Sequence, residues 1–158
     1  MMDLEGMITE VRGVIAAAWP EVVPNGIWEA EQAERLPEAK FTLPYAVFRI
    51  PFLPGSQPEP GQLLFEPTVE ILYVDASRGS LAPLRGKLLT LMRAFWPVNP
   101  LTTATVTGVP VLSYSTPSEH NTLFGNRGTV WANQYFAQKG SFKRAGMIQI
   151  TLKLQESP

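Results

Sequence analysis

The sequence predicts an α+β fold in which two amphipathic helices pack on one face of a mainly antiparallel sheet. Three observations lead to this prediction. Two segments, near residues 3–19 and 80–96, repeat apolar residues at helical spacing on one side only. Several other segments alternate apolar and polar residues with the period of a strand. The order is helix, strands, helix, strands, which is typical of a two-layer α+β domain.

The first helix is expected over residues 3–19. Its apolar face would consist of Leu4, Met7, Ile8, Val11, Val14, Ile15 and Ala18. Pro20 ends it, because proline cannot continue a helix. Asn25-Gly26 then marks a turn. Residues 27–30 predict a short edge strand, and residues 31–37 predict an exposed loop or helical turn.

The next strand carries apolar residues on both faces. These are Tyr45 and Val47 on one face, and Ala46, Phe48 and Ile50 on the other. Such a pattern is typical of a strand inside a sheet, so residues 43–50 are predicted to be central. Residues 51–64 follow as a Pro/Gly-rich loop. Proline cannot donate to a ladder and glycine weakens one, so this loop is expected to be either a disordered surface connection or an extended arm that reaches a partner.

Residues 65–97 predict a strand that leads into a helix. One side of the strand carries Val69, Ile71 and Tyr73. The other side carries Glu66, Thr68 and Glu70, so the strand is expected to be half-buried with a solvated polar face. Ser80 is expected to cap the helix. The apolar stripe of the helix consists of Leu81, Leu84, Leu88, Leu91 or Met92, and Phe95.

Three strand-like runs complete the chain, at residues 103–114, 129–138 and 145–155. The last one alternates most clearly between apolar and polar residues. A polar segment between the first two runs predicts a loop. No internal repeat or low-complexity tract divides the chain, so residues 1–158 predict a single domain.

Composition excludes several classes of protein. The chain has no cysteine, which excludes disulfides, zinc-thiolate sites and thiol catalysis. No run of about 18 apolar residues predicts a membrane span. The acidic start of the chain does not resemble a signal peptide, so synthesis in the cytoplasm is expected.

Charge is distributed unevenly along the chain. Residues 1–38 carry eight acidic side chains against two arginines, and residues 78–158 carry nine basic side chains against two glutamates. Either the two parts neutralise each other within one domain, or a subunit presents an acidic surface to a neighbour's basic surface, as a head-to-tail ring requires. The second interpretation makes three groups candidate interface residues. They are the acidic Glu29, Glu31, Glu34 and Glu38, the loop residues Pro54, Gly55 and Gln57, and the basic Arg127, Lys139, Lys143 and Arg144.

Candidate catalytic groups do not converge. His120 is the only histidine and stands in a polar segment, which is typical of a solvated side chain. Glu66 and Glu70 would lie roughly 13 Å apart at about 3.3 Å per residue, too far for a carboxylate dyad. Residues 79–87 fail as a phosphate loop, because six residues separate the glycines and Leu88 replaces the magnesium-binding hydroxyl. We therefore expect no enzyme, cofactor or metal site, and a pI near 5.9 does not favour a dedicated nucleic-acid binder.

The layout of the chain resembles that of tailed-phage tail terminators and related tail-completion proteins. The resemblance rests on the helix at 3–19, LPYAVFRIP (43–51), the Pro-rich loop, EPTVEILYVDAS (66–77) with its helix, and the strand-rich end. It implies a structural virion protein whose copies form a ring, most often a hexamer. That ring would cap the tail tube and meet the head connector or head-completion protein, with DNA passing through its lumen unread.

The resemblance also implies a location in the virion, and in the host cytoplasm during assembly. Two alternatives stay open. One is another neck or head–tail connector protein of a phage. The other is a cellular α+β module that binds a ligand or a protein, which would need a concave apolar pocket within a monomer.

Overall fold

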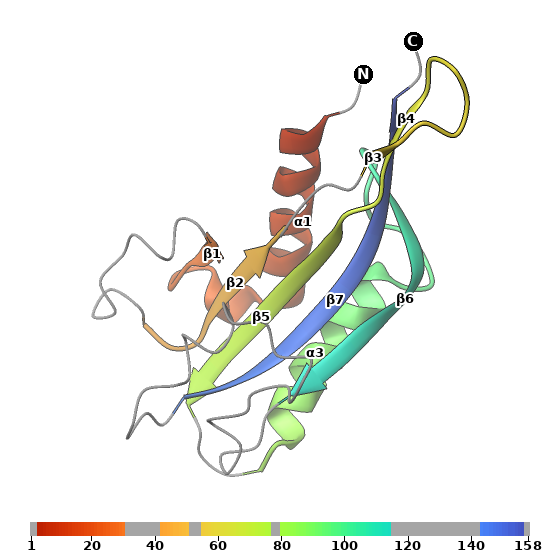
Figure 1. The fold of residues 1–158 in the computed structure, drawn as a ribbon. Coiled ribbons are helices and arrows are strands. Elements are labelled where there is room, and N and C mark those ends of the chain that lie inside the picture. Colours follow the sequence, from red (N-terminus) through yellow and green to blue (C-terminus); the bar gives the residue numbers. More distant parts are fainter. Residues whose placement is uncertain (1–2, 31–41, 51–54, 77–79, 115–142, 157–158) are drawn as a thin grey trace.

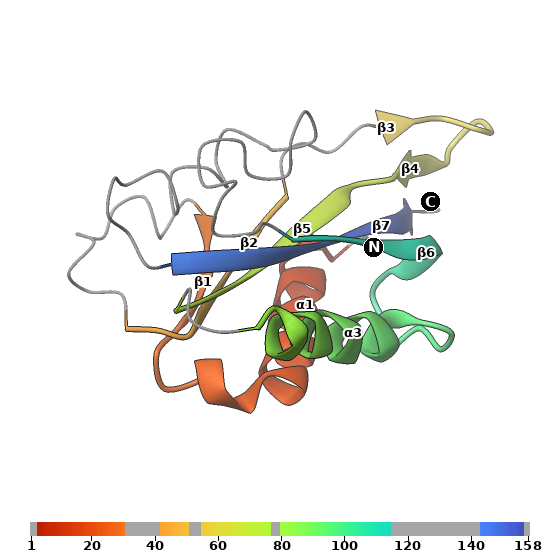
Figure 2. The ribbon, with the colours of Figure 1, turned by 90° about the horizontal axis from the view of Figure 1, so that it is seen from below.

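The computed structural model describes residues 3–30, 42–50, 55–76, 80–114 and 143–156. In these ranges, helices α1 (Leu4–Ala18) and α3 (Ala82–Phe95) lie on the same face of a mixed, mainly antiparallel sheet of seven strands (Figures 1 and 2). A short 3-10 helix, η1 (Pro20–Val22), follows α1. The predicted α+β fold, with both helices on one face, is therefore confirmed.

The sheet is built around two long strands, β5 (Thr68–Ala76) and β7 (Lys143–Glu156). The remaining strands are β1 (Ile27–Glu29), β2 (Tyr45–Arg49), β3 (Gly55–Ser56), β4 (Leu63–Phe65) and β6 (Thr105–Tyr114). Their order is β1-β2-β5-β7-β4-β3, in which β5 and β4 pair with successive stretches of β7. Strand β6 pairs with β7 along its other edge. Only the β1–β2 pair is parallel among these ladders.

The predicted central strand is β2, which pairs with β1 on one side and β5 on the other. The short strand expected at 27–30 is β1, and β2 is its partner among the described residues. The C-terminal strand begins at Lys143, two residues before the predicted start. The strand expected at 129–138 lies outside the described residues.

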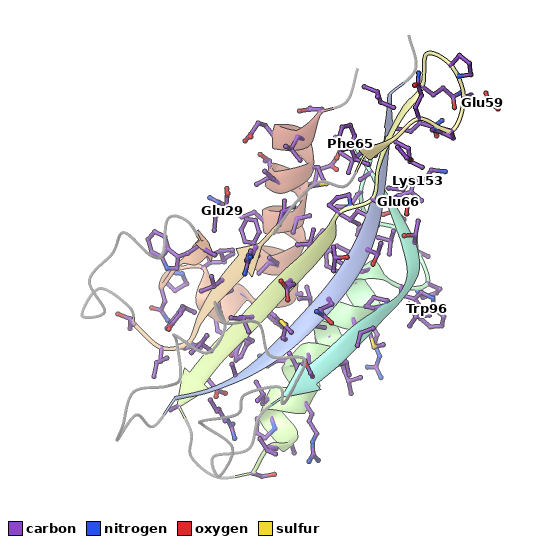
Figure 3. The ribbon with its side chains drawn as sticks, viewed as in Figure 1. Glu29, Glu59, Phe65, Glu66, Trp96 and Lys153 are labelled. Carbon is purple, nitrogen blue, oxygen red and sulfur yellow. The ribbon has the colours of Figure 1, made fainter. Side chains whose placement is uncertain are left out.

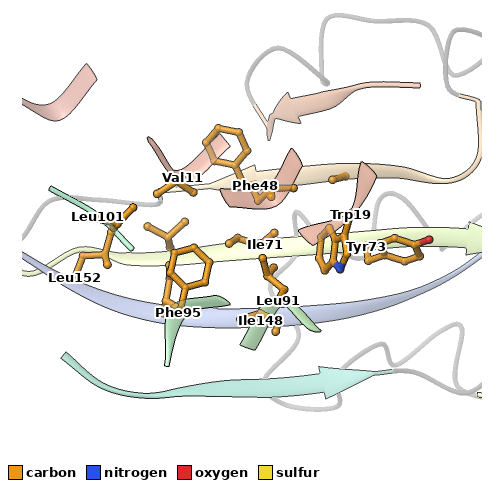
Figure 4. Packing of buried hydrophobic residues seen from close by; sticks show 14 of the residues in the cluster. Val11, Trp19, Phe48, Ile71, Tyr73, Leu91, Phe95, Leu101, Ile148 and Leu152 are labelled. Atoms are coloured by element: carbon orange, nitrogen blue, oxygen red, sulfur yellow. The ribbon is translucent and has the colours of Figure 1, made fainter. Parts of the chain in front are cut away.

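The main core lies between the helices and the sheet. Met7, Val11 and Ile15 of α1 are buried there against Leu84, Leu88, Leu91 and Phe95 of α3 and against the inner face of β2, β5 and β7 (Figure 4). Trp19 closes the end of α1: its ring meets Tyr73 edge to face at 4.9 Å between centroids. Its Nε1 donates to the Lys87 carbonyl oxygen at 2.8 Å, so α1, α3 and β5 meet at this side chain.

Helix α1 begins as predicted, with the Asp3 carboxylate accepting from the Gly6 N–H at 2.8 Å. Helix α3 begins at Ala82, and Leu81 rather than Ser80 is at its N-cap position. The Ser80 hydroxyl still accepts from the Ala82 N–H at 3.1 Å, so it satisfies one N–H of the first turn.

The prediction that β5 has a solvated face is wrong. Leu72 and Val74 are fully buried on that face, and Glu70 is only 3% exposed. The Gln149 Nε2 donates to the Glu70 Oε2 at 3.3 Å. The reason is a second apolar cluster on the sheet face opposite the helices, formed by Ala30, Tyr45, Val47, Leu72, Val74, Ala145 and Met147. Strand β5 is therefore buried on both faces.

Candidate subunit interface

The structure describes five of the predicted interface residues. Glu29 ends β1, Gly55 and Gln57 lie at the β3–β4 hairpin, and Lys143 and Arg144 begin β7. The other six lie outside the described residues: Glu31, Glu34, Glu38, Pro54, Arg127 and Lys139.

Glu29 has a charged partner within the same subunit. The Arg12 Nη2 lies 3.4 Å from the Glu29 Oε1, and both side chains are partly exposed. The Arg12 guanidinium also lies over the Phe48 ring, 5.5 Å from its centroid. The pair connects α1 to β1, so at this position the acidic charge is balanced inside the chain.

Arg144 is not an exposed basic residue, and it is withdrawn from the candidate patch. It is 3% exposed, and its Nε lies 2.7 Å from the Asp75 Oδ1. Its Nη1 donates to the Ser80 carbonyl oxygen at 2.8 Å, which ties β7 to the start of α3. The cause is the strand register, because Asp75 and Arg144 are direct partners in the β5–β7 ladder. Removing one member of such a buried pair leaves an uncompensated charge.

Glu21 connects the acidic start of the chain to its basic later part. The Lys87 Nζ lies 2.8 Å from the Glu21 Oε1, and the Tyr73 hydroxyl donates to the same oxygen at 3.0 Å. Burial favours the neutral form of Glu21, but the hydrogen bonds and charge of these partners outweigh it and lower the pKa of Glu21. Burial, followed by the Glu21 hydrogen bond and charge, raises the pKa of the Tyr73 hydroxyl. This ion pair joins the acidic first part of the chain to its basic later part within one subunit, as expected if the two parts neutralise each other.

Part of the predicted Pro/Gly-rich loop is a β-hairpin. Gly55 pairs with Phe65 and Ser56 with Leu64, so residues 55–65 fold back on themselves. A Cβ at Gly55 would lie 3.2 Å from the Phe65 ring, so glycine suits this close pairing. The hairpin extends past the end of the helices, and residues 55–61 are exposed (Figures 1 and 2). Describing all of 51–64 as a loop was therefore wrong for β3 and β4.

The outer face of α3 is a surface that the sequence reasoning did not consider. Arg85, Leu89, Arg93 and Trp96 are exposed at steps of four, four and three residues. Leu89 is 37% and Trp96 47% exposed, and Val98 just beyond them is 75% exposed. Leu89 and Trp96 could have been found in the sequence as apolar residues that fall outside the predicted buried stripe of the helix.

The segment after Trp96 is held by a dense set of hydrogen bonds. The Asn99 Nδ2 donates to the carbonyl oxygens of Leu101 and Ala104, at 3.2 and 2.9 Å. The Glu10 carboxylate of α1 accepts from the backbone N–H and the hydroxyl of both Thr102 and Thr103. The Thr102 hydroxyl contributes most, followed by the Thr103 hydroxyl, and together they lower the pKa of Glu10 to about 2. These bonds hold residues 99–104, the chain that directly follows Trp96 and Val98.

The described residues contain no group of three or more His, Asp or Glu side chains arranged to hold a metal ion. Neither α1 nor α3 has the length and apolarity needed to cross a membrane. His120 lies outside the described residues. No protein-family model matches the chain, and no curated protein matches it.

Proposed function

We propose that this protein is a structural subunit of a tailed-phage virion, a tail terminator. Its copies would form a ring, a hexamer, that caps the tail tube and joins it to the head connector. The observation that carries the proposal is the layout of the fold. The segments that suggested the resemblance correspond to α1, the interior strand β2, the Pro-rich connection that contains β3 and β4, β5 with α3, and the paired strands β6 and β7.

The surface of the subunit supports an assembling role. The hairpin and the outer face of α3 expose apolar side chains, among them Leu63 at 47% and Trp96 at 47%. On α3, the exposed Leu89 and Trp96 share one face of the helix, and exposed large apolar residues that gather on one face are typical of contact surfaces between proteins. Under this proposal the partners are further copies of the chain, the tail tube protein and a head-completion protein, and DNA passes through the lumen without being read.

A deletion experiment tests this function. Phage particles made without the chain are expected to yield DNA-filled heads and separate tails of irregular length, and the chain supplied in trans should restore joining. Electron microscopy of complete particles should show a ring of this chain at the head-proximal end of the tube. A ring on the connector instead would favour another neck protein. A single copy per particle, or absence from particles, would refute the assignment.

A further inference from the structure

The β3–β4 hairpin is a projecting, acidic and apolar element. Residues 55–65 contain Glu59 and no lysine or arginine. Glu59 lies in the turn of the hairpin, and Leu63 at the start of β4 is 47% exposed (Figure 3). The Gln62 N–H donates to the Glu59 carbonyl oxygen at 3.1 Å, and Gly61 takes a φ of 80°, so the turn is shaped by its own backbone.

The outer face of α3 is the opposite in charge and also apolar. Residues 80–114 contain Arg85, Lys87 and Arg93 and no aspartate or glutamate. Lys87 is used by Glu21, whereas Arg93 lies on the exposed stripe between Leu89 and Trp96. Tryptophan and arginine are the residues most enriched at the energetic centres of protein interfaces. The chain that follows this stripe is anchored through Glu10 and Asn99, which limits the ordering cost of binding at this end of α3.

The β3–β4 hairpin and the outer face of α3 lie apart on the molecule, so they do not contact each other within one subunit. Figure 2 shows α3 beneath the sheet, whereas the hairpin continues the sheet through β4, which pairs with β7, at the upper right of the view and away from α3. A head-to-tail ring needs two different patches on every subunit, complementary to each other and separated on the molecule. Their opposite charge and shared apolar character meet that requirement.

We propose that the β3–β4 hairpin of one subunit packs along the outer face of α3 of a second copy of this chain, with Glu59 near Arg93 and Leu63 near Leu89 and Trp96. This interface rests on the proposed function, which supplies the ring. A hairpin of this length is smaller than the roughly 20–30 residues per side of a standard stable interface. A single contact is therefore weak, and the ring forms when several contacts close together or on the tube end.

Engineered disulfides test the contact directly, because the natural chain has no cysteine. Gly86 lies on the outer face of α3 and Gly13 on α1, and a side chain at either glycine would have open space around it. Purified Gln57→Cys/Gly86→Cys protein should form intermolecular disulfides up to closed rings on mild oxidation at high concentration. The matched Gln57→Cys/Gly13→Cys protein should remain mostly uncrosslinked. Equal yields from the two proteins would overturn the interface.

Sedimentation of charge-reversal and side-chain variants provides a second test of the contact. Glu59→Lys and Arg93→Glu should each weaken self-association about fivefold, and the double reversal should recover most of it. Trp96→Ala should weaken it about tenfold or more. Additive losses in the double reversal would count against the Glu59–Arg93 pairing.

A density map of the assembled particle separates failure of this interface from failure of the proposed function, and it needs no variant. A ring in which the hairpin contacts α3 of the next copy supports both. A ring whose contacts avoid the hairpin or α3 refutes the interface and leaves the tail assignment standing. Absence of any ring of this chain refutes both.

Discussion

Glu10 joins α1 to the segment between α3 and β6 through one carboxylate. Its oxygens accept hydrogen bonds from the backbone N–H and the hydroxyl of both Thr102 and Thr103, including one of 2.6 Å from the Thr103 hydroxyl. These bonds favour the charged form and lower the pKa of Glu10 to about 2. A depressed pKa stabilises the folded state above the ordinary value near 4.5, and this contribution is lost as pH falls through about 2.

Replacing Glu10 should therefore remove part of the pH dependence of stability. Glu10→Gln is expected to lower the free energy of unfolding at pH 7, and the difference from wild type should shrink between pH 4.5 and 2. Urea unfolding at a series of pH values measures this. Glu5→Gln, at an exposed position on the same helix, is the control. Its free energy of unfolding should stay close to that of wild type over the same pH range. A Glu10→Gln curve parallel to wild type would contradict the role given to these hydrogen bonds.

Gly146 of β7 lets α3 approach the sheet closely. A Cβ at this position would lie 2.4 Å from the Leu88 Cδ1, and Leu88 is fully buried. Gly146→Ala should lower the free energy of unfolding by about 1–3 kcal/mol, because a packed core has little room for a displaced side chain. Leu88→Ala alone should cost about 2–5 kcal/mol.

A double-mutant cycle decides whether this contact is the cause. In the Leu88→Ala background, Gly146→Ala should cost close to nothing, since the space is already free. Equal costs in both backgrounds, measured by urea unfolding, would show that Gly146 is needed for another reason.

At the scale of elements, three glycines in the helices separate the effect of local contacts from the effect of helix propensity. Gly13 and Gly86 are exposed, and an added Cβ at either meets nothing within 4 Å, so Gly13→Ala and Gly86→Ala should each stabilise the subunit by about 0.5–1 kcal/mol. A Cβ at Gly6 would instead lie 2.2 Å from the Asp3 Oδ2. Gly6→Ala should therefore lower the free energy of unfolding, at most by the about 0.5–2 kcal/mol that loss of an N-cap costs. Thermal unfolding of dilute protein compares the three, and a stabilised Gly6→Ala would contradict the cap geometry.

Elements whose signal is local were predictable from the sequence. The apolar stripes of α1 and α3 depend on spacing within each helix, and their predicted members are buried or packed against the core. The face of β5 that carries Glu70 was not predictable in this way, because its burial depends on what covers the sheet. The run Ile71–Val74, apolar without interruption, was the available signal for a strand buried on both faces.

The candidate interface was less predictable than the fold. Arg144 looks like a surface cation in sequence, but its pairing with Asp75 is fixed by a ladder between strands far apart in the chain. The hairpin was hidden because Pro58, Pro60 and Gly61 stand between its two strands, which are very short. The outer face of α3 could have been recognised from the sequence, because Leu89 and Trp96 fall outside the predicted buried stripe of the helix.

At the scale of the whole molecule, one core connects the described elements. Residues of α1, α3, β2, β5 and β7 belong to a single buried cluster, and Trp19 contacts both Lys87 and Tyr73. The helices and the sheet should therefore unfold together. Far-ultraviolet circular dichroism and tryptophan fluorescence are expected to give coincident urea transitions. Transitions at separate urea concentrations would mean that part of the chain folds independently.

Adjacent leucines of α3 test the same core and the helix register together. Leu88→Asp should abolish the cooperative transition, because it places a charge in the buried cluster without a partner. Leu89→Asp adds the same charge at the next residue, which is 37% exposed, and should unfold with the wild-type transition. A soluble, cooperatively folded Leu88→Asp protein would show that α3 is not packed through this face. A Leu89→Asp protein that unfolds like Leu88→Asp would show that the exposed stripe is part of the core, and the hairpin interface would then lose its docking surface.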